Sequence, residues 1–245
     1  MELTFKQHFI SQWKKYFGDA ELPITFYYSD QAESWSNDSG PHCLICDLQR
    51  VRRGETHAHS LETLNCAGAK RYVGFAQTIR TNFNYFLSCG IPGVVRGERY
   101  KKSPEIVEQA MKNQPPFEAP AKNIVFKRWD KLDESDDPQA VIFFATPDVL
   151  AGLFTLVNFN CVETQGVIAP FGAGCASIIY YPYHESLKES PCAVLGMFDV
   201  SARPCVKANE LTFSLPINRF RQVVEYMDES FLITESWEKV QKRIK

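Results

Sequence analysis

The stretch NIVFKRWDKLDESDDPQAVIFFAT, residues 123–146, has a segment with the composition of a β-strand at each end. Residues 123–129 and 140–146 are rich in Val, Ile and Phe, which are favoured in strands. Between them, residues 132–139 are acidic, contain Pro138 and are expected to be exposed. The stretch therefore predicts two strands joined by an exposed connection, which is either a long hairpin loop or a boundary between subdomains.

Further strands and helices are expected on both sides of this stretch. Strand-like composition recurs at residues 22–28, 194–200 and 210–216, and a polar loop is expected over 29–41. Helical spacing of apolar residues or helix-starting residues predict helices over 1–18 and 43–53, and others that begin at Asn65, Ser103, Thr146 and Pro216.

Strands and helices mix without strict alternation, which predicts an α+β fold with a mixed or antiparallel sheet and flanking helices. The expected organisation is a single domain over 1–245. Two subdomains, about 1–131 and 139–245, joined by the acidic segment 132–138, are the alternative.

The composition limits the classes of partner. The chain has 245 residues, 44% hydrophobic and 23% charged, which is enough to bury a core. Its 27 basic and 29 acidic residues nearly cancel, so we expect neither nucleic acid nor a membrane surface as a partner. The longest charge-free stretch, 164–184, contains glycines and prolines that argue against a membrane span. A small molecule or a redox partner is expected instead, and nothing indicates the oligomeric state.

The chain contains eight cysteines and begins without the pattern of a secretory signal. This combination favours a reducing compartment, the cytoplasm, in which thiols stay reduced. Free cysteine is often simply buried, and the surroundings of Cys89 and Cys161 make these two the first candidates for core thiols.

Cys43 and Cys46 form a CxxC pair on an expected helix, with both sulfurs on one face. Cys66 follows after His57 and His59. A zinc ribbon is disfavoured because no second CxxC occurs at the usual distance. Two metal sites remain open: zinc bound by Cys43, Cys46, Cys66 and one histidine, or an iron–sulfur cluster bound by several cysteines. The alternative without a metal is a buried helix face with two incidental thiols.

Cys66 and Cys175 each lie in a run of small residues that opens an expected helix, NCAGA and FGAGCASI. Small residues let a ligand approach the backbone, so Gly68, Gly172 and Gly174 are candidate cofactor-binding residues. A helix start stabilises a thiolate, which suits metal ligation, anion binding or nucleophilic attack. The alternative for the second run is a tight connection into a packed helix.

Other patterns carry less information. Cys192 and Cys205 each follow a proline near residues 194–200, from where they could supply further ligands. His184 is a conceivable base for Cys175. The basic runs 49–55 and 96–102 are expected to be solvated surface, with contact to an anionic ligand as the alternative. The FGAGCAS loop lacks the lysine and spacing of a Walker phosphate loop and no GxGxxG follows a strand, so nucleotide binding has no specific support.

Several short motifs together resemble one prokaryotic family. They are CDLQRVRRGE (46–55), NCAGAKRYVG (65–74), GAGCASIIYYPY (172–183), SPC (190–192) and FDVSAR (198–203). In this order they are similar to domain of unknown function 169, also called the archaeal conserved region family. The resemblance implies that Cys46, Cys66, Cys175 and Cys192 are its characteristic cysteines, and four is the number a four-iron cluster uses. The chain departs from the pattern at Ala67, where the family more often has proline, and it adds Cys43. No reaction is implied.

The sequence thus predicts a metal centre on Cys43, Cys46, Cys66, Cys175 and Cys192. An iron–sulfur cluster is the first expectation and zinc the alternative, in redox chemistry or in the handling of a small molecule. Two other functions stay open: a metal-free thiol enzyme that uses Cys175 or Cys66, and a non-catalytic binding or regulatory module with structural cysteines. Whether the protein is an enzyme is left undecided.

Overall fold

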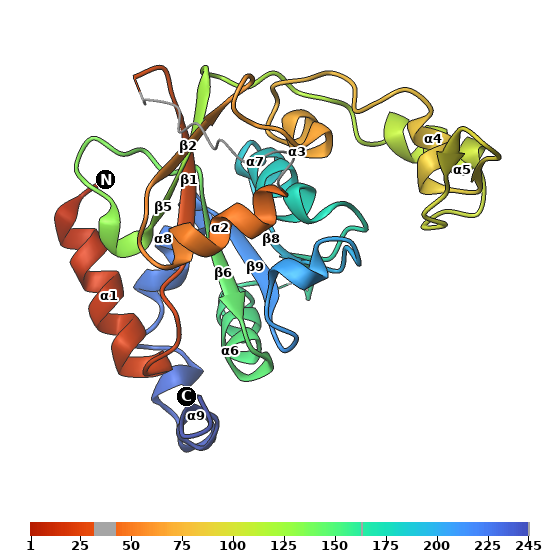
Figure 1. The fold of residues 1–245 in the computed structure, drawn as a ribbon. Coiled ribbons are helices and arrows are strands. Elements are labelled where there is room, and N and C mark those ends of the chain that lie inside the picture. Colours follow the sequence, from red (N-terminus) through yellow and green to blue (C-terminus); the bar gives the residue numbers. More distant parts are fainter. Residues whose placement is uncertain (32–42, 163, 245) are drawn as a thin grey trace.

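A seven-stranded sheet forms the centre of the protein, in the order β2-β5-β1-β6-β9-β8-β7 (Figure 1). The structure is a computed structural model and describes residues 1–31, 43–162 and 164–244. Among these residues β7 and β8 pair in parallel and the other neighbours pair antiparallel, so the predicted α+β fold with a mixed sheet is confirmed. The strands are β1 (Ile24–Ser29), β2 (His57–Ser60), β5 (Asn123–Arg128), β6 (Ala140–Ala145), β7 (Val167–Ile168), β8 (Ala193–Gly196) and β9 (Leu211–Pro216).

The stretch 123–146 supplies two strands that are not neighbours. β1 lies between β5 and β6 and pairs with both of them. The acidic connection is therefore no hairpin loop, and strands from both sides of residues 132–138 take part in the same sheet.

Strand β6 shows how the sheet separates two hydrophobic cores. Val141, Phe143 and Ala145 belong to one core, and the alternating residues Ile142 and Phe144 belong to the other. Since successive side chains of a strand point to opposite faces, both faces of the sheet are covered. Burial on both faces explains why the strand is apolar throughout and not alternating.

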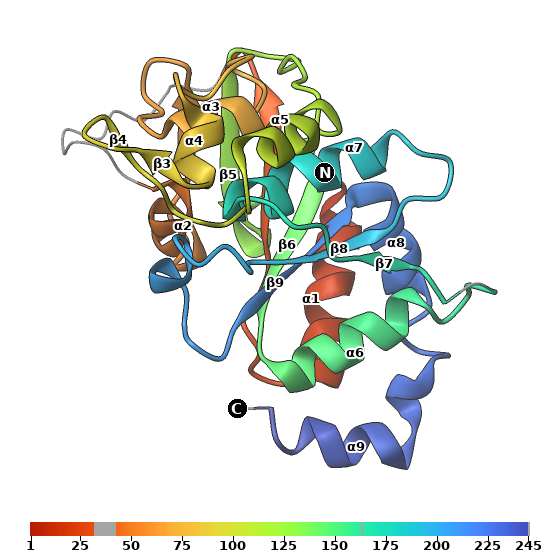
Figure 2. The same cartoon turned by 90° about the vertical axis from the view of Figure 1, so that its right-hand side faces the viewer.

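Most helices that cover the first face come from the two ends of the chain and from the segment after β6, and η1 follows β5 (Figures 1 and 2). An aromatic cluster holds them against the sheet: Phe9 and Phe220 have ring centroids 4.9 Å apart, and Trp129 lies 4.9 Å from Phe220. The elements on this face are α1 (Leu3–Phe17), η1 (Trp129–Lys131), α6 (Pro147–Val157), α8 (Ile217–Glu225), η4 (Phe231–Ile233) and α9 (Glu235–Gln241).

The second face carries α2 (Leu44–Arg52), α3 (Ala67–Tyr72) and a helical run over residues 174–186. This run contains a π-helix, η2 (Ala176–Tyr180), followed by α7 (Tyr181–Ser186). The short helix η3 (Arg203–Cys205) lies beside α2.

Between α3 and β5 the chain makes an excursion, residues 75–118, which we call the lobe. It contains α4 (Phe83–Leu87), β3 (Gly90–Ile91), β4 (Val95–Arg96) and α5 (Pro104–Lys112). α4 and α5 stand away from the sheet at the right of Figure 1 and face the viewer in Figure 2. The lobe leaves and returns at one point, because Ala119 N donates a hydrogen bond of 2.9 Å to Gly74 O.

The observed elements confirm most of the expected ones and correct two of their boundaries. Helix α3 has its N-cap at Cys66 and not at Asn65. The strand expected over 194–200 ends at Gly196, because Met197 has a positive φ of 68°. Strands β2, β3, β4 and β7 and helices α4 and α9 were not expected. The polar loop over 29–41 falls mostly on residues 32–42, which lie outside the described residues. No helix in the described ranges is long and apolar enough to cross a membrane.

Candidate cysteine centre and cavity

Three sulfur atoms meet where α2 lies beside η3. The Sγ atoms of Cys43, Cys46 and Cys205 all lie within 4.8 Å of one another, close enough to hold a metal ion. Cys46 and Cys205 are joined by a disulfide bond. The expectation that all the cysteines are reduced is therefore wrong for this pair. The fold brings their Cα atoms to 4.7 Å, within the range that a disulfide spans.

The local structure around α2 explains how this group is held. Cys43 is the N-cap of α2, and Cys46 N donates a hydrogen bond of 2.9 Å to Cys43 O, so one helical turn carries both sulfurs. One turn later, Gln49 Nε2 donates a 2.6 Å hydrogen bond to Cys205 O. The position of η3 against α2 thus depends on a hydrogen bond as well as on the disulfide.

A cavity of about 630 Å³ adjoins this group. Cys43, Cys66 and Cys175 line it, which places thiols from three separate parts of the chain on its wall. Most of the remaining wall comes from the lobe, from α3 and from residues 171–175 and 198–202, and Ile45 and Tyr181 complete it. The volume lies in the range of small-molecule sites.

Cys66 starts α3 and faces this cavity. Its Sγ accepts a hydrogen bond of 3.5 Å from Ala69 N, so the cysteine caps the helix itself. The predicted placement at a helix start is confirmed, with the cap shifted by one residue from Asn65.

Cys175 lies in the first turn of the helical run 174–186, where the sequence places a helix start. Gly174 N, just before it, donates a 2.9 Å hydrogen bond to Asp199 Oδ2. Ser177 Oγ donates to Gly174 O at 2.8 Å, and a Cβ on Gly196 would come within 2.2 Å of the Ser177 Cβ. The turn that carries Cys175 is therefore packed tightly against β8.

The thiols of Cys43 and Cys175 are both held in their neutral form. Burial raises the pKa of Cys175 well above its ordinary value, and the nearby Cys66 and Cys43 raise it further. Burial also raises the pKa of Cys43, although the amides of Ile45 and Cys46 act in the opposite direction. Neither thiol has the depressed pKa of an activated nucleophile.

The three glycines predicted to bind a cofactor all line the cavity. A Cβ on Gly68 would meet only Cys66 Sγ, at 3.9 Å, so this position borders open space. A Cβ on Gly174 would come within 3.0 Å of the Ala202 Cβ, so that glycine also serves close packing. A role of these glycines in binding stays a prediction.

The histidines lie elsewhere. The close group of ligand atoms found among the described residues contains neither His57 nor His59, which are buried in β2. Burial, followed by the neighbouring His57, lowers the pKa of His59 to about 4. His184 packs against Tyr180, with ring centroids 4.3 Å apart, and is not among the residues that line the cavity.

Three further cysteines also lie apart from the cavity wall. Cys192 Sγ donates to Gln165 O at 3.3 Å, and Cys192 N donates to Glu185 at 2.9 Å. Cys89 is exposed and Cys161 is half-buried, so the expectation that these two are core thiols is wrong. Cys205 joins the centre and Cys192 does not, although each directly follows a proline, so the sequence context alone could not separate the two.

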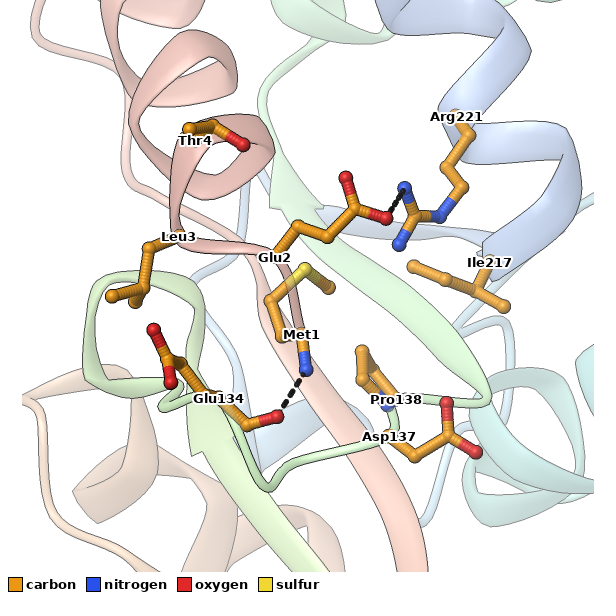
Figure 3. Close-up of a pocket in the computed structure, with 9 residues that line it drawn as sticks. All are labelled: Met1, Glu2, Leu3, Thr4, Glu134, Asp137, Pro138, Ile217 and Arg221. Atoms are coloured by element: carbon orange, nitrogen blue, oxygen red, sulfur yellow. Dashed lines mark hydrogen bonds and ion pairs between the residues drawn. The ribbon is translucent and has the colours of Figure 1, made fainter.

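A second hollow, of about 590 Å³, lies near the start of α1 (Figure 3). Two of its charged groups have partners there: Glu2 contacts Arg221 at 3.8 Å, and the Met1 amine donates a 2.8 Å hydrogen bond to the backbone oxygen of Glu134. No cysteine lines it, so the candidate site remains the cavity beside the cysteines.

A family model described as DUF169, uncharacterised ArCR, matches residues 15–226. The chain belongs to the DUF169 family. The match spans the sheet, the cysteine group and the lobe, and it confirms the resemblance drawn from the sequence motifs. Neither the search of curated proteins nor that of solved structures gives a match.

Of the four cysteines characteristic of the DUF169 family, three lie at or beside the cavity. Cys66 and Cys175 line the cavity, and Cys46 lies beside it in contact with Cys43. Cys192 is not in this arrangement. The third sulfur of the close group with Cys43 and Cys46 comes from Cys205.

Proposed function

We propose that this protein holds an iron–sulfur cluster on Cys43, Cys46, Cys66 and Cys175, facing the cavity, and that the cluster serves redox chemistry or the handling of a small molecule there. The observation that carries the proposal is the meeting of Cys43, Cys46 and Cys205 within 4.8 Å, at the edge of the cavity that Cys66 and Cys175 line. Cysteines from distant parts of the chain converge where a ligand has room to bind.

The electrostatics of the thiols favour a metal over a bare nucleophile. The group must lose protons to react or to ligate, yet burial and the neighbouring thiols raise the pKa of Cys175 and Cys43. A cation compensates the mutual repulsion of thiolates, and a coordinating thiol is deprotonated outright. A bound metal would therefore supply the positive charge that stabilises these thiolates, which the surrounding protein does not provide.

Cys205 has a separate role in this proposal. In the disulfide it occupies the sulfur of Cys46, which cannot then ligate a metal. A dithiol reductant transfers two electrons to the bond, which yields two protein thiols and the cyclic disulfide of the reductant. Reduction therefore precedes loading of the centre.

A zinc ion and an iron–sulfur cluster make different demands on these cysteines. A single zinc ion fits the tight group of Cys43, Cys46 and Cys205, with one further ligand. A cluster spans more space and draws on Cys66 and Cys175 across the cavity wall. Cys205 is then needed only for the disulfide.

The test is anaerobic purification of the full chain, reduction with dithiothreitol, incubation with iron and sulfide or with zinc, and measurement of bound iron, sulfide and zinc. We expect bound iron and sulfide in the wild type and in Cys205→Ser, and their loss in Cys66→Ser and Cys175→Ser. Cys192→Ser and Cys161→Ser are matched controls that keep the metal.

Two results would decide against the cluster. Loss of metal in Cys205→Ser together with retention in Cys175→Ser would assign a zinc site. A reduced chain that stays free of iron and zinc would remove the metal centre altogether.

The second candidate is a metal-free thiol enzyme with Cys66 as the nucleophile. Its support is the position of Cys66, which starts α3, accepts a hydrogen bond from Ala69 N at Sγ and lines the cavity. The pH dependence of iodoacetamide alkylation, compared between the wild type and Cys66→Ser, tests it. A Cys66 that alkylates with a midpoint near the ordinary value of about 8.5 would rule this candidate out.

A further inference from the structure

We infer that the cavity beside the cysteines binds an amphipathic organic anion, whose apolar body lies on the aromatic wall and whose carboxylate or phosphate head lies between Arg80 and Lys101. The binding itself does not depend on the proposed cluster. That this anion is the molecule the cluster meets rests on the proposed function.

The wall of the cavity is apolar and partly open to water. Phe171, Phe198 and Val200 line it and are 60%, 50% and 67% exposed. A group of exposed, large apolar side chains that line one cavity is typical of a ligand-binding site. The lobe contributes Phe83 and Phe86 to the same cavity.

Two cations lie directly on this aromatic wall. Lys101 Nζ is 4.4 Å from the centroid of Phe171, and Arg80 Cζ is 4.4 Å from the centroid of Phe86. All four residues line the cavity. Both positive charges are therefore held at its surface by cation–π contacts.

Neither cation is neutralised by a carboxylate within the described part of the chain. The ion pairs found there involve other lysines and arginines, as in Lys127 with Asp136 and Arg52 with Glu210. Positive charges that rest on rings and not on carboxylates keep their hydrogen-bond donors for a ligand.

The two cations reach the same end of the lobe. Lys101 N donates a 3.0 Å hydrogen bond to Leu87 O at the end of α4, next to Phe86, the residue whose ring carries Arg80. Phe171 belongs to the sheet-bearing part of the protein, so the Lys101–Phe171 contact bridges that part and the lobe. An anionic head is thereby expected where the two parts meet.

The acidic residues of the wall do not reverse this preference. Asp199 accepts hydrogen bonds from Gly174 N, Ser201 N and Ser201 Oγ, at 2.9, 3.0 and 2.7 Å. Its oxygens are thus occupied by the protein. Glu98 is the other carboxylate that lines the cavity, and it is exposed. A cationic amphiphile is therefore a necessary control.

Calorimetric titration of the full chain, without added metal, tests the inference. The probes are decanoate, decyl phosphate, decan-1-ol and decylamine, which share one alkyl chain. We expect at least one of the two anions to bind about tenfold more tightly than the alcohol or the amine, since hydrogen bonds to charged groups add that much affinity. The stronger of decanoate and decyl phosphate identifies the head group.

Matched variants locate the head. Lys101→Met and Arg80→Met should each remove most of the preference for the anion over the alcohol. Lys102→Met and Arg96→Met, exposed lobe positions outside the cavity wall, should leave it unchanged. Val200→Glu adds a negative charge at an exposed wall position and should weaken the anion more than the alcohol.

Equal binding of anion and alcohol, tighter binding of decylamine, or an anion preference that persists in both Lys101→Met and Arg80→Met would each overturn the inference. None of these outcomes bears on iron and sulfide loading, which is measured separately. Failure to load a cluster likewise leaves the binding result standing.

Discussion

Cys46 in α2 and Cys205 in η3 are joined by a disulfide that closes a separation of 159 residues in the sequence. The bond fixes η3, with the adjoining residues of the cavity wall, against the helix that carries the CxxC pair. Because Cys43 lies within 4.8 Å of both sulfurs, the redox state of this bond determines how many thiols the site can offer.

Reduction of the disulfide should destabilise the protein. A bond that closes so long a loop restricts the unfolded chain, and its loss typically lowers the free energy of unfolding by roughly 2 to 5 kcal/mol. Urea unfolding should show this loss in Cys205→Ser and in the wild type with dithiothreitol. With the reductant present the two proteins should agree, and Cys192→Ser should match the oxidised wild type. An identical transition with and without dithiothreitol would contradict the prediction.

Metal loading of the reduced chain should strengthen as the pH rises. The pKa values of Cys43 and Cys175 are raised, so both thiols carry protons at neutral pH and must release them on ligation. Each released proton changes the apparent affinity by up to about tenfold per pH unit. Competition of Co²⁺ between the protein and a chelator from pH 6.5 to 8.5, corrected for the chelator's own protonation, measures the slope. A flat profile would show that the bound ligands are already deprotonated.

Strand β2 should make the folded state sensitive to mild acid through His59. Its pKa is about 4 in the folded protein and near 6.5 when unfolded, so between these values the unfolded chain binds more protons. The contribution is fully present above pH 6.5 and is lost as the pH falls toward 4. Between pH 7.5 and 5 it amounts to about 2 kcal/mol. His59→Phe, measured by urea unfolding at both pH values, should lose this part of the slope, whereas an unchanged slope would assign it to other groups.

The connection between the lobe and the rest of the protein should depend on Gly74. This residue has a φ of +83°, and a Cβ there would come within 2.7 Å of Ala119 N. Gly93 has a φ of +75° with open space around it, so Gly93→Ala adds only the cost of the backbone conformation, about 1 kcal/mol. Gly74→Ala should cost about 1 to 3 kcal/mol more, because the backbone must shift. Urea unfolding of both variants measures the difference, and equal losses would show that the contact is unimportant.

Where local chemistry determines an element, the sequence predicts it well. Ser103 followed by Pro104 marks the start of α5, and Ser103 Oγ accepts the hydrogen bond from Ile106 N that defines a cap. Strand β6 is recognisable from its composition. Strand β2, by contrast, has the sequence HAHS, which lacks strand-forming residues, and it forms because the fold buries it against β5.

Contacts between residues far apart in the chain could not be predicted from the sequence. β5 and β6 follow each other along the chain, yet β1 inserts between them, and no residue of the connection indicates this. The same holds for the candidate site. Cys66 and Cys175 were recognisable as helix-start thiols, whereas Cys205 became part of the centre only because η3 packs on α2. The basic run 96–102 was expected to be surface, and only the position of the lobe brings Lys101 to the cavity wall.

The lobe leaves and rejoins the rest of the protein at Gly74 and Ala119. The cavity is therefore lined by two sets of residues, one inside the lobe and one outside it. One wall is encoded in an uninterrupted segment, residues 75–118, whereas the thiols belong to segments that the sheet holds in place. A change confined to that segment would therefore reshape one wall of the cavity and leave Cys43, Cys66 and Cys175 in place. The shape of the cavity and the position of its thiols thus depend on different parts of the chain.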